Sequence, residues 1–317
     1  MAYEIVDVFT DRPFAGNPLA VVFGADDLAG DQMQTLAREF NLSETVFVLP
    51  STAGATYRAR IFTPETELPF AGHPSVGAAV TAVRRGLATA GQIIQECGAG
   101  LLPITVTSDA ATLTGGKPTL GEPLPVPEML ELVGLNADDF AGGSALGNGA
   151  VLADGAVLAG GTAIAGGVAF AGGAAGPAVA GCGLEFVILP VRRDALARAW
   201  ADPDRARALG VTGISVFAWA ATERTAYVRV FCPGVSVPED PATGSAALGL
   251  GVWLVGHGWL PGEGTTPYTV HQGIEMHRPS LLECTVTATG GMATRATVAG
   301  HVVPVARGDI AVPPFIG

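Results

Sequence analysis

Positive charge is scarce in this sequence. Lysine and arginine together number 17, against 29 aspartates and glutamates, so the formal net charge is −12. The longest basic runs are the pairs Arg84-Arg85 and Arg192-Arg193. Because a nucleic-acid partner requires clustered lysine and arginine, this composition argues against nucleic-acid binding.

Cysteine is sparse as well. The four cysteines, Cys97, Cys182, Cys232 and Cys284, lie far apart, with no C-x-x-C pair and no histidine at metal-ligand spacing. We therefore expect no metal site. Scattered single cysteines are typical of a protein in a reducing compartment, so the sequence predicts a cytoplasmic location.

Membrane-spanning and secretory signals are also missing from the sequence. The opening residues MAYEIVDVFTDRPF contain early acidic residues and neither the basic nor the apolar region of a signal peptide. The stretch between Asp154 and Glu185 carries no charge, but it consists largely of glycine and alanine. Because a spanning helix is richer in leucine, isoleucine and phenylalanine, we expect no membrane partner.

The 317 residues suffice for two domains of about 150 residues, and part of the sequence is repeated. The segment RIFTPETELPFAGHPSVGAA begins at Arg60, and RVFCPGVSVPEDPATGSAALG begins at Arg229. Both open with arginine, a β-branched residue, phenylalanine, any residue and proline, and both reach a glycine-centred triplet. Such recurrence in order predicts a duplicated α/β unit whose two copies face each other across a cleft.

Each glycine triplet is followed by a helix of small residues. The sequence predicts these helices over 74–85 and 245–255, with Gly86 after the first and Gly256 and Gly258 after the second. A helix N-terminus offers unpaired backbone N–H groups and a partial positive charge, and a preceding glycine allows close approach. Two converging N-termini could hold a small carboxylate-bearing substrate. His73 and Ser245 would be N-caps or ligand contacts, and an ordinary N-cap is the simpler alternative for Ser245.

Glu44 is the candidate acid–base residue. Met33, Leu36, Ala37 and Phe40 have the spacing of an amphipathic helix, which Asn41 can end in a left-handed conformation, and TVFVLP predicts a buried strand. Glu44 immediately precedes that strand. It is either a solvated loop residue or a partly desolvated carboxylate whose raised pKa allows proton transfer near neutral pH. Asp240 and His73 could hold or polarise a substrate beside it.

Five phrases together resemble the PhzF-like phenazine-biosynthesis isomerase family: DVFTDRPFAGNPLAVV, AREFNLSETVFV, RIFTPETELPFAGHP, EDPATGSA and HQGIEMHRPS. The resemblance covers about 1–120 and 184–310. It implies an α+β fold of two pseudo-symmetric diaminopimelate-epimerase-like halves, each a mostly antiparallel sheet wrapped around a central helix, with the active site in the cleft between them. We expect the halves at 1–125 and 184–317, joined by a connector at 126–183, with the C-terminal strand able to return to the first half.

The resemblance also implies a cofactor-free, homodimeric isomerase, best known for isomerising trans-2,3-dihydro-3-hydroxyanthranilate. It makes Glu44 the general acid and base that carries a proton from C3 of the ring to C1. His73, Asp240 and Ser245 would bind or orient the substrate at the catalytic centre. The remaining candidate binding residues are Asn17, Gly72, Thr243, Gly244, Gln272 and Gly273.

Related epimerases and racemases use two thiols, one at the head of each glycine turn. Here the corresponding residues are Ala71 and Thr243, and neither exchanges a proton at physiological pH. Two alternatives remain open. One is a racemase or epimerase of the same fold with non-thiol bases, in which Asp240 would oppose Glu44. The other is a non-catalytic binding protein that kept the fold.

Residues 140–173 depart from the family pattern. Large apolar residues recur there at every sixth position, each followed mostly by glycine and alanine: Phe140, Leu146, Leu152, Leu158, Ile164 and Phe170. This is the hexapeptide pattern of a left-handed parallel β-helix, and six hexads predict about two coils. A loose glycine–alanine loop is the alternative, because glycine raises the entropic cost of ordering the chain.

Overall fold

The computed structural model describes residues 1–142, 175–235 and 237–314. The predicted hexad coil lies outside the described residues, except for residues 140–142 at its start. Within the described ranges, no helix is both long and apolar enough to cross a bilayer.

Runs of consecutive strands are separated by helices along the described chain, which fits the predicted α+β class. The first group comprises β1 (Ala2–Val8), β2 (Asn17–Phe23), α1 (Gly30–Phe40), β3 (Glu44–Leu49), β4 (Tyr57–Phe62), β5 (Glu67–Leu68), α2 (Gly72–Arg84), β6 (Gly91–Cys97), β7 (Gly100–Val106) and β8 (Ala110–Thr114). The next elements are β9 (Pro118–Pro123), α3 (Val126–Leu132) and the short 3-10 helix η1 (Ala137–Asp139).

The second group follows the undescribed segment. It comprises β10 (Ala178–Cys182), β11 (Glu185–Pro190), η2 (Arg193–Arg198), α4 (Pro203–Leu209), β12 (Ile214–Ala220), β13 (Thr225–Cys232), η3 (Pro233–Val235), β14 (Val237–Asp240), α5 (Gly244–Gly256), β15 (Gly264–Gln272), β16 (Ser280–Thr289) and β17 (Met292–Asp309).

The two groups pair their strands in the same order. In the first group β2 and β3 are parallel, β4 is antiparallel to β3 and β5 but parallel to β6, and β6, β7 and β8 are antiparallel. In the second group β11 to β17 repeat this sequence of orientations. Most pairings are therefore antiparallel, as predicted. The repeated order supports the predicted duplication, while the symmetry between the halves stays a prediction.

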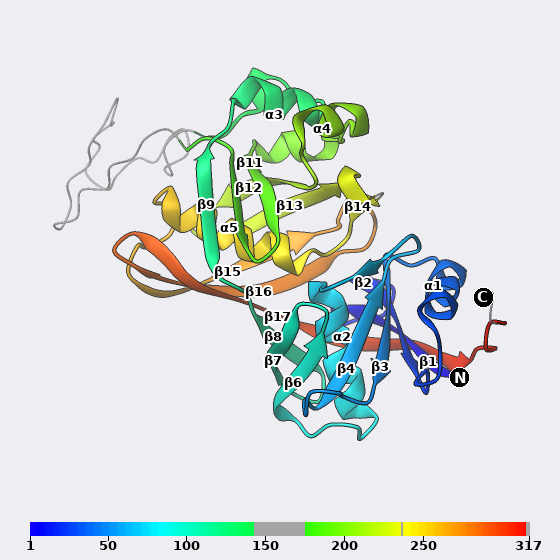
Figure 1. Cartoon of the computed structure of the whole chain (residues 1–317). Helices are drawn as coiled ribbons and strands as arrows, with labels where there is room; N and C mark the ends of the chain where they lie inside the picture. Colours follow the sequence, from blue (N-terminus) through cyan, green and yellow to red (C-terminus); the bar gives the residue numbers. More distant parts are fainter. Residues whose placement is uncertain (143–174, 236, 315–317) are drawn as a thin grey trace.

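The described strands form one continuous sheet rather than two separate ones. The reason is β17, which pairs with β16 and β8 along its first part and with β1 over residues 302–309. Figure 1 shows this strand running from the upper group of elements to the lower one, next to the N-terminal strand. The C-terminal strand thus returns to the first group and joins the two.

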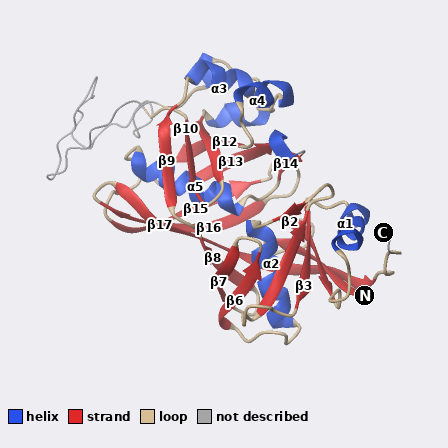
Figure 2. Cartoon of the chain, viewed as in Figure 1, coloured by secondary structure: helices blue, strands red, loops and turns tan. Residues whose placement is uncertain are grey.

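The centre of each strand group is occupied by one helix (Figures 1 and 2). Residues 72–82 of α2 are all buried, and α5 is buried at nearly every position. Both helices are built from small and apolar residues on all sides, which suits helices without a solvent face. Helices α1, α3 and α4 instead cover outer surfaces of the strands with one apolar side each.

The sequence predicted the central helices with small errors at their starts. Helix α2 begins at Gly72 and α5 at Gly244, with Ala71 and Thr243 as extended N-caps. The first alternative, that His73 and Ser245 are N-caps, is therefore wrong, because each occupies the second helical position, and the other, that they contact the ligand, stays a prediction. Pro74 takes the third position, where the missing N–H would have had no partner within the helix.

The elements that place Glu44 agree with the sequence. Helix α1 buries Met33, Leu36 and Ala37, and Asn41 ends it with φ 50° and ψ 36°, the predicted left-handed cap. Three residues after this cap, β3 begins at Glu44 itself, between β2 and β4. Glu44 is thus the first residue of a strand, not the last residue of a loop.

Candidate active site

The N-termini of the two central helices meet. A Cβ atom placed on Gly72 would lie only 3.7 Å from the backbone nitrogen of Ser245 and 3.8 Å from Cα of Gly244. The first turns of α2 and α5 therefore direct their unpaired N–H groups toward a common region. Two partial positive charges are combined there, which favours an anionic ligand.

Polar side chains from both strand groups surround this meeting point. Asn17 and Glu44 come from the starts of β2 and β3, His73 from the first turn of α2, and Asp240 from the end of β14. Asn17, His73 and Asp240 are all less than a tenth exposed. The structure thus brings together residues that are up to 223 positions apart in the sequence.

The Asp240 carboxylate is held by donors on both oxygens. Asn17 Nδ2 donates to Oδ1 at 2.8 Å, and Thr243 Oγ1 donates to Oδ2 at 2.5 Å. Gln272 completes the arrangement, since its Nε2 donates to the Asp240 backbone oxygen at 2.7 Å and its Oε1 accepts from Thr243 N at 3.1 Å. Thr243 and Gln272 therefore fix Asp240, and their polar side-chain atoms are engaged in doing so.

Glu44 and His73 face each other without a hydrogen bond. Glu44 Oε2 lies 3.6 Å from His73 Nε2, which is too long for one. Among the described residues, neither atom has a hydrogen-bond partner, although both are buried. Unpaired buried polar atoms are costly, and this pair lies at the first turn of α2, to which His73 belongs.

Burial sets the charges of these groups. It raises the pKa of Glu44 from 4.5 to about 8, with a smaller contribution from the nearby Asp240 carboxylate. Burial also raises the pKa of Asp240 to about 6, against the hydrogen bonds from Thr243 and Asn17. It lowers the pKa of His73 to about 3. Near neutral pH His73 is therefore uncharged, and its contact with Glu44 is not an ion pair.

Two further predicted residues, Ser245 and Gly273, lie outside the hydrogen-bond network around Asp240. Ser245 is half-buried in the first turn of α5 and takes no part in the hydrogen bonds around Asp240. Gly273 has φ +74°, and a Cβ there would lie 2.4 Å from the oxygen of Arg278 and 2.7 Å from that of Pro241. Only glycine fits at this position, so Gly273 shapes the loop beside Asp240.

An ion pair that the sequence did not reveal connects two loops next to the site. Asp7 is 1% exposed and accepts from Arg278 Nη2 at 2.5 Å, while Arg278 Nε donates to the backbone oxygen of Gly16 at 2.9 Å. The pair links the turn before Asn17 to the loop after Gly273. Both residues stand in quoted motifs, but nothing in the sequence indicated that they pair.

A buried thiol also lies near the two carboxyl groups. Burial, together with the charges of Asp240 and Glu44, raises the pKa of Cys232 above its ordinary value. Cys232 is at the end of β13 and not at a helix N-cap, where Ala71 and Thr243 stand. The two positions that thiol-dependent racemases use thus carry no thiol. The described residues also contain no group of three or more His, Cys, Asp or Glu side chains that could hold a metal ion.

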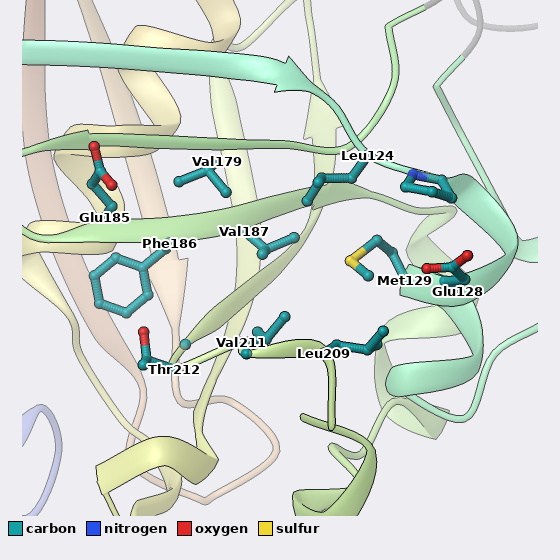
Figure 3. A pocket seen from close by; sticks show the side chains of 13 residues that line it. Leu124, Glu128, Met129, Val179, Glu185, Phe186, Val187, Leu209, Val211 and Thr212 are labelled. Atoms are coloured by element: carbon teal, nitrogen blue, oxygen red, sulfur yellow. The ribbon is translucent and has the colours of Figure 1, made fainter. Parts of the chain in front are cut away.

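Two surface cavities lie away from these residues. The larger, of about 340 Å³, is formed by α3, β11 and the loop after α4, with apolar side chains such as Met129, Phe186 and Val187 on its walls (Figure 3). The second, of about 260 Å³, is lined by residues of the loop after β1 and by β16. Neither cavity is lined by Glu44, His73 or Asp240.

Comparison with known proteins gives consistent matches over nearly the whole chain. The family model described as phenazine biosynthesis-like protein (PhzC-PhzF) matches residues 6–308. An uncharacterized isomerase of Mesorhizobium japonicum is 36% identical over 322 residues, which cover 97% of this chain and 98% of the relative. The trans-2,3-dihydro-3-hydroxyanthranilate isomerase of Pseudomonas fluorescens is 32% identical over 316 residues, covering 97% and 98%.

A solved structure gives the same result for the fold. The crystal structure of a PhzF-family phenazine biosynthesis protein of Bacillus anthracis superimposes with a TM-score of 0.80. The match covers 98% of this chain and 99% of that chain, at 23% sequence identity.

Proposed function

The chain belongs to the PhzC/PhzF family of phenazine biosynthesis-like proteins and is an isomerase, and we propose that it moves a proton between two carbons of a small carboxylate-bearing substrate with Glu44 as the only acid and base. The family resemblance found in the sequence is thereby confirmed. The proposed reaction gains and loses no atoms, so a single group that accepts a proton and returns it elsewhere is sufficient.

The observation that carries this proposal is the state of Glu44. Its Oε2 is buried and has no hydrogen-bond partner among the described residues, and burial raises its pKa to about 8. A carboxyl group with this pKa can both accept and release a proton near neutral pH. The converging first turns of α2 and α5 provide the binding site for the carboxylate of the substrate.

The geometry favours one base over two. Both oxygens of Asp240 already accept hydrogen bonds, from Asn17 and Thr243, whereas Glu44 Oε2 has no partner in the part of the chain that the structure describes. Racemisation by Glu44 and Asp240 on opposite faces of a carbon would require Asp240 to give up one of these contacts. Asp240 instead acts as a fixed charge that helps keep Glu44 protonated in the free enzyme.

The first substrate to test is trans-2,3-dihydro-3-hydroxyanthranilate, because the Pseudomonas fluorescens relative is named for its isomerisation. In this assignment Glu44 takes the proton from C3 of the ring and returns it to C1, without a cofactor. His73, Ser245 and the backbone at Gly72 and Gly244 orient the substrate. Asn17, Thr243, Gln272 and Gly273 support it through Asp240.

The test is proton transfer in heavy water. The protein is incubated with this substrate, and NMR and ultraviolet absorbance follow its loss and the appearance of hydrogen or deuterium at C1. Glu44→Gln is run beside Glu39→Gln, which changes an exposed carboxylate on α1. We expect turnover in the wild type and in Glu39→Gln, and at least about a 100-fold loss in Glu44→Gln.

The outcomes separate substrate from mechanism. Equal turnover by Glu44→Gln would refute the role of Glu44. No turnover by the wild type would reject this substrate, and the same exchange assay with other unsaturated carboxylates would then test the reaction type itself.

The proposal extends to assembly and location. By its family resemblance the protein forms a homodimer, which light scattering after gel filtration measures directly. A reducing, cytoplasmic setting is supported by the four cysteines, none of which forms a disulfide within the described residues.

A further inference from the structure

The amide of Asn17 lies between two residues of the site. Its Nδ2 is 2.8 Å from Asp240 Oδ1, 3.1 Å from the backbone oxygen of Ala242 and 3.2 Å from His73 Nδ1. Asn17 is completely buried, so water does not compete for these contacts. One of the two amide hydrogens is shared between two acceptors, a common arrangement.

The orientation of this amide is fixed by its neighbours. A backbone carbonyl oxygen can only accept a hydrogen bond, and so can an ionised carboxylate. If the amide were turned around, Asn17 Oδ1 would face both the Asp240 carboxylate and the Ala242 carbonyl, and three oxygens would repel one another. The nitrogen of Asn17 must therefore point toward Asp240 and His73.

This orientation determines which nitrogen of His73 carries the proton. An amide nitrogen has no lone pair to offer, so a proton on His73 Nδ1 would point at a group that cannot accept it. Nδ1 is therefore the acceptor, and the proton resides on Nε2. Turning the ring over would place carbon-bound hydrogens against both Asn17 and Glu44 and lose the contact altogether.

We propose that Asn17 is a positioning residue that holds His73 in its neutral Nε2–H form, so that His73 is a fixed hydrogen-bond donor at the reacting centre. This inference rests on the proposed function for its catalytic meaning, but the protonated nitrogen can be determined without turnover. The Asp240 carboxylate, itself held by Thr243, orients the Asn17 amide dipole and completes the chain of contacts.

The donor has a defined task. His73 Nε2–H points toward Glu44 Oε2 across 3.6 Å, and neither atom has a partner among the described residues. A substrate oxygen placed beside them would accept from Nε2–H while Glu44 exchanges the proton on carbon. Because Nε2 already carries a hydrogen, His73 cannot compete with Glu44 for the transferred proton.

The decisive measurement is the tautomer of His73 in the resting protein. Long-range proton–nitrogen NMR spectra of histidine-labelled protein distinguish Nε2–H, Nδ1–H and charged rings, and His73→Gln assigns the signal among the five histidines. His257 provides an internal reference for the Nδ1–H tautomer. Its Nδ1 lies 2.9 Å from the backbone oxygen of Trp253, which can only accept, so Nδ1 must donate. We expect Nε2–H for His73 and Nδ1–H for His257 at pH 7.

Substitution of Asn17 tests the cause. Asn17→Asp replaces the donor with an acceptor, so the His73 proton should move to Nδ1 or the ring should become charged. Asn136→Asp is the matched control, because it adds the same charge at an exposed cap that aspartate also suits. A merely structural Asn17 would leave the His73 signal unchanged in every variant that folds.

Activity provides a second readout. The amide of His73→Gln can place an N–H where Nε2 was, whereas that of His73→Asn lies nearer to Nδ1. With an active substrate, we expect His73→Asn to lose about 100-fold in kcat/KM, as for a lost oxyanion donor, and His73→Gln to lose clearly less. Equal losses, or an Nδ1–H or charged His73 in the wild type, would overturn the inference. Failure of the proposed function would appear instead as absent turnover with the tautomer as expected.

Discussion

Replacement of Glu44 by glutamine should make the protein more stable while it abolishes turnover. Burial raises the pKa of Glu44 from 4.5 to about 8. Between these values the folded protein holds a proton that the unfolded chain has released, so the free energy of unfolding falls as pH rises through this range. Glutamine does not ionise, so the free energy of unfolding of Glu44→Gln should lack this decrease with pH.

The magnitude follows from the two pKa values. Each pH unit is worth about 1.4 kcal/mol, and pH 7 lies about 2.5 units above the unfolded value of 4.5. The quantity to compare is the unfolding free energy of Glu44→Gln minus that of the wild type. At pH 7 this difference should be about 3 kcal/mol larger than it is below pH 4. Above pH 8 it should level off at about 5 kcal/mol. The Glu44 side chain is only 16% exposed, so solvent screens little of this effect.

The assay is urea unfolding of both proteins between pH 4 and pH 9, followed by tryptophan fluorescence and analysed as differences at each pH. The subtraction removes groups that titrate alike in both proteins, and Glu39→Gln is the control for loss of an exposed carboxylate. A difference that stays constant from pH 4 to pH 9 would refute the reasoning. Glu44 would then have an ordinary pKa, and the basis for its role as a proton carrier near neutral pH would be lost.

Three further predictions concern the same region. If Glu44 must be ionised to accept the substrate proton, kcat/KM should rise with pH up to about 8, and a rise that ends near pH 4.5 would contradict this. Gly264→Ala places an alanine at φ +80° with open space around it and should lower the free energy of unfolding by ~1–2 kcal/mol. Gly273→Ala adds a backbone clash to a positive φ and should lower it by well over that amount. Equal losses in urea unfolding would show that the clash is absent. Arg278→Met removes the counter-charge of the buried Asp7 carboxylate and should cost about 3 kcal/mol in urea unfolding, whereas Arg192→Met, in an exposed pair, should cost far less. Equally small costs for both variants would show that the buried pair does not matter.

Much of the fold was accessible from local sequence signals. The amphipathic spacing from Met33 to Phe40 and the cap at Asn41 depend on neighbours within a few positions, and both were predicted correctly. The starts of α2 and α5 were placed too late, because a glycine at the first helical position carries no local signal that distinguishes it from a turn. Only the extended conformations of Ala71 and Thr243 define those starts.

The sequence could name candidate site residues but not their arrangement, and their roles stay a prediction. Motifs identified Glu44, His73 and Asp240 as candidates, and the structure brings them together. The sequence left open whether Glu44 is solvated, since its pKa depends on burial by segments from both groups. The pairing of Asp7 with Arg278, 271 positions apart, has no local signature at all. Nor does the orientation of the Asn17 amide, which depends on Asp240 and Ala242 from the other end of the chain.

The course of β17 has a consequence for biosynthesis. Its residues 302–309 provide an antiparallel neighbour for β1, which is synthesised about 300 residues earlier. Translation proceeds at about 5–20 residues per second, so for many seconds β1 lacks β17 and, of its two partners among the described strands, has only β2. The first group of strands therefore keeps an open edge until residues 302–309 have been made, and this edge is a natural point for chaperone binding or for misassembly between nascent chains.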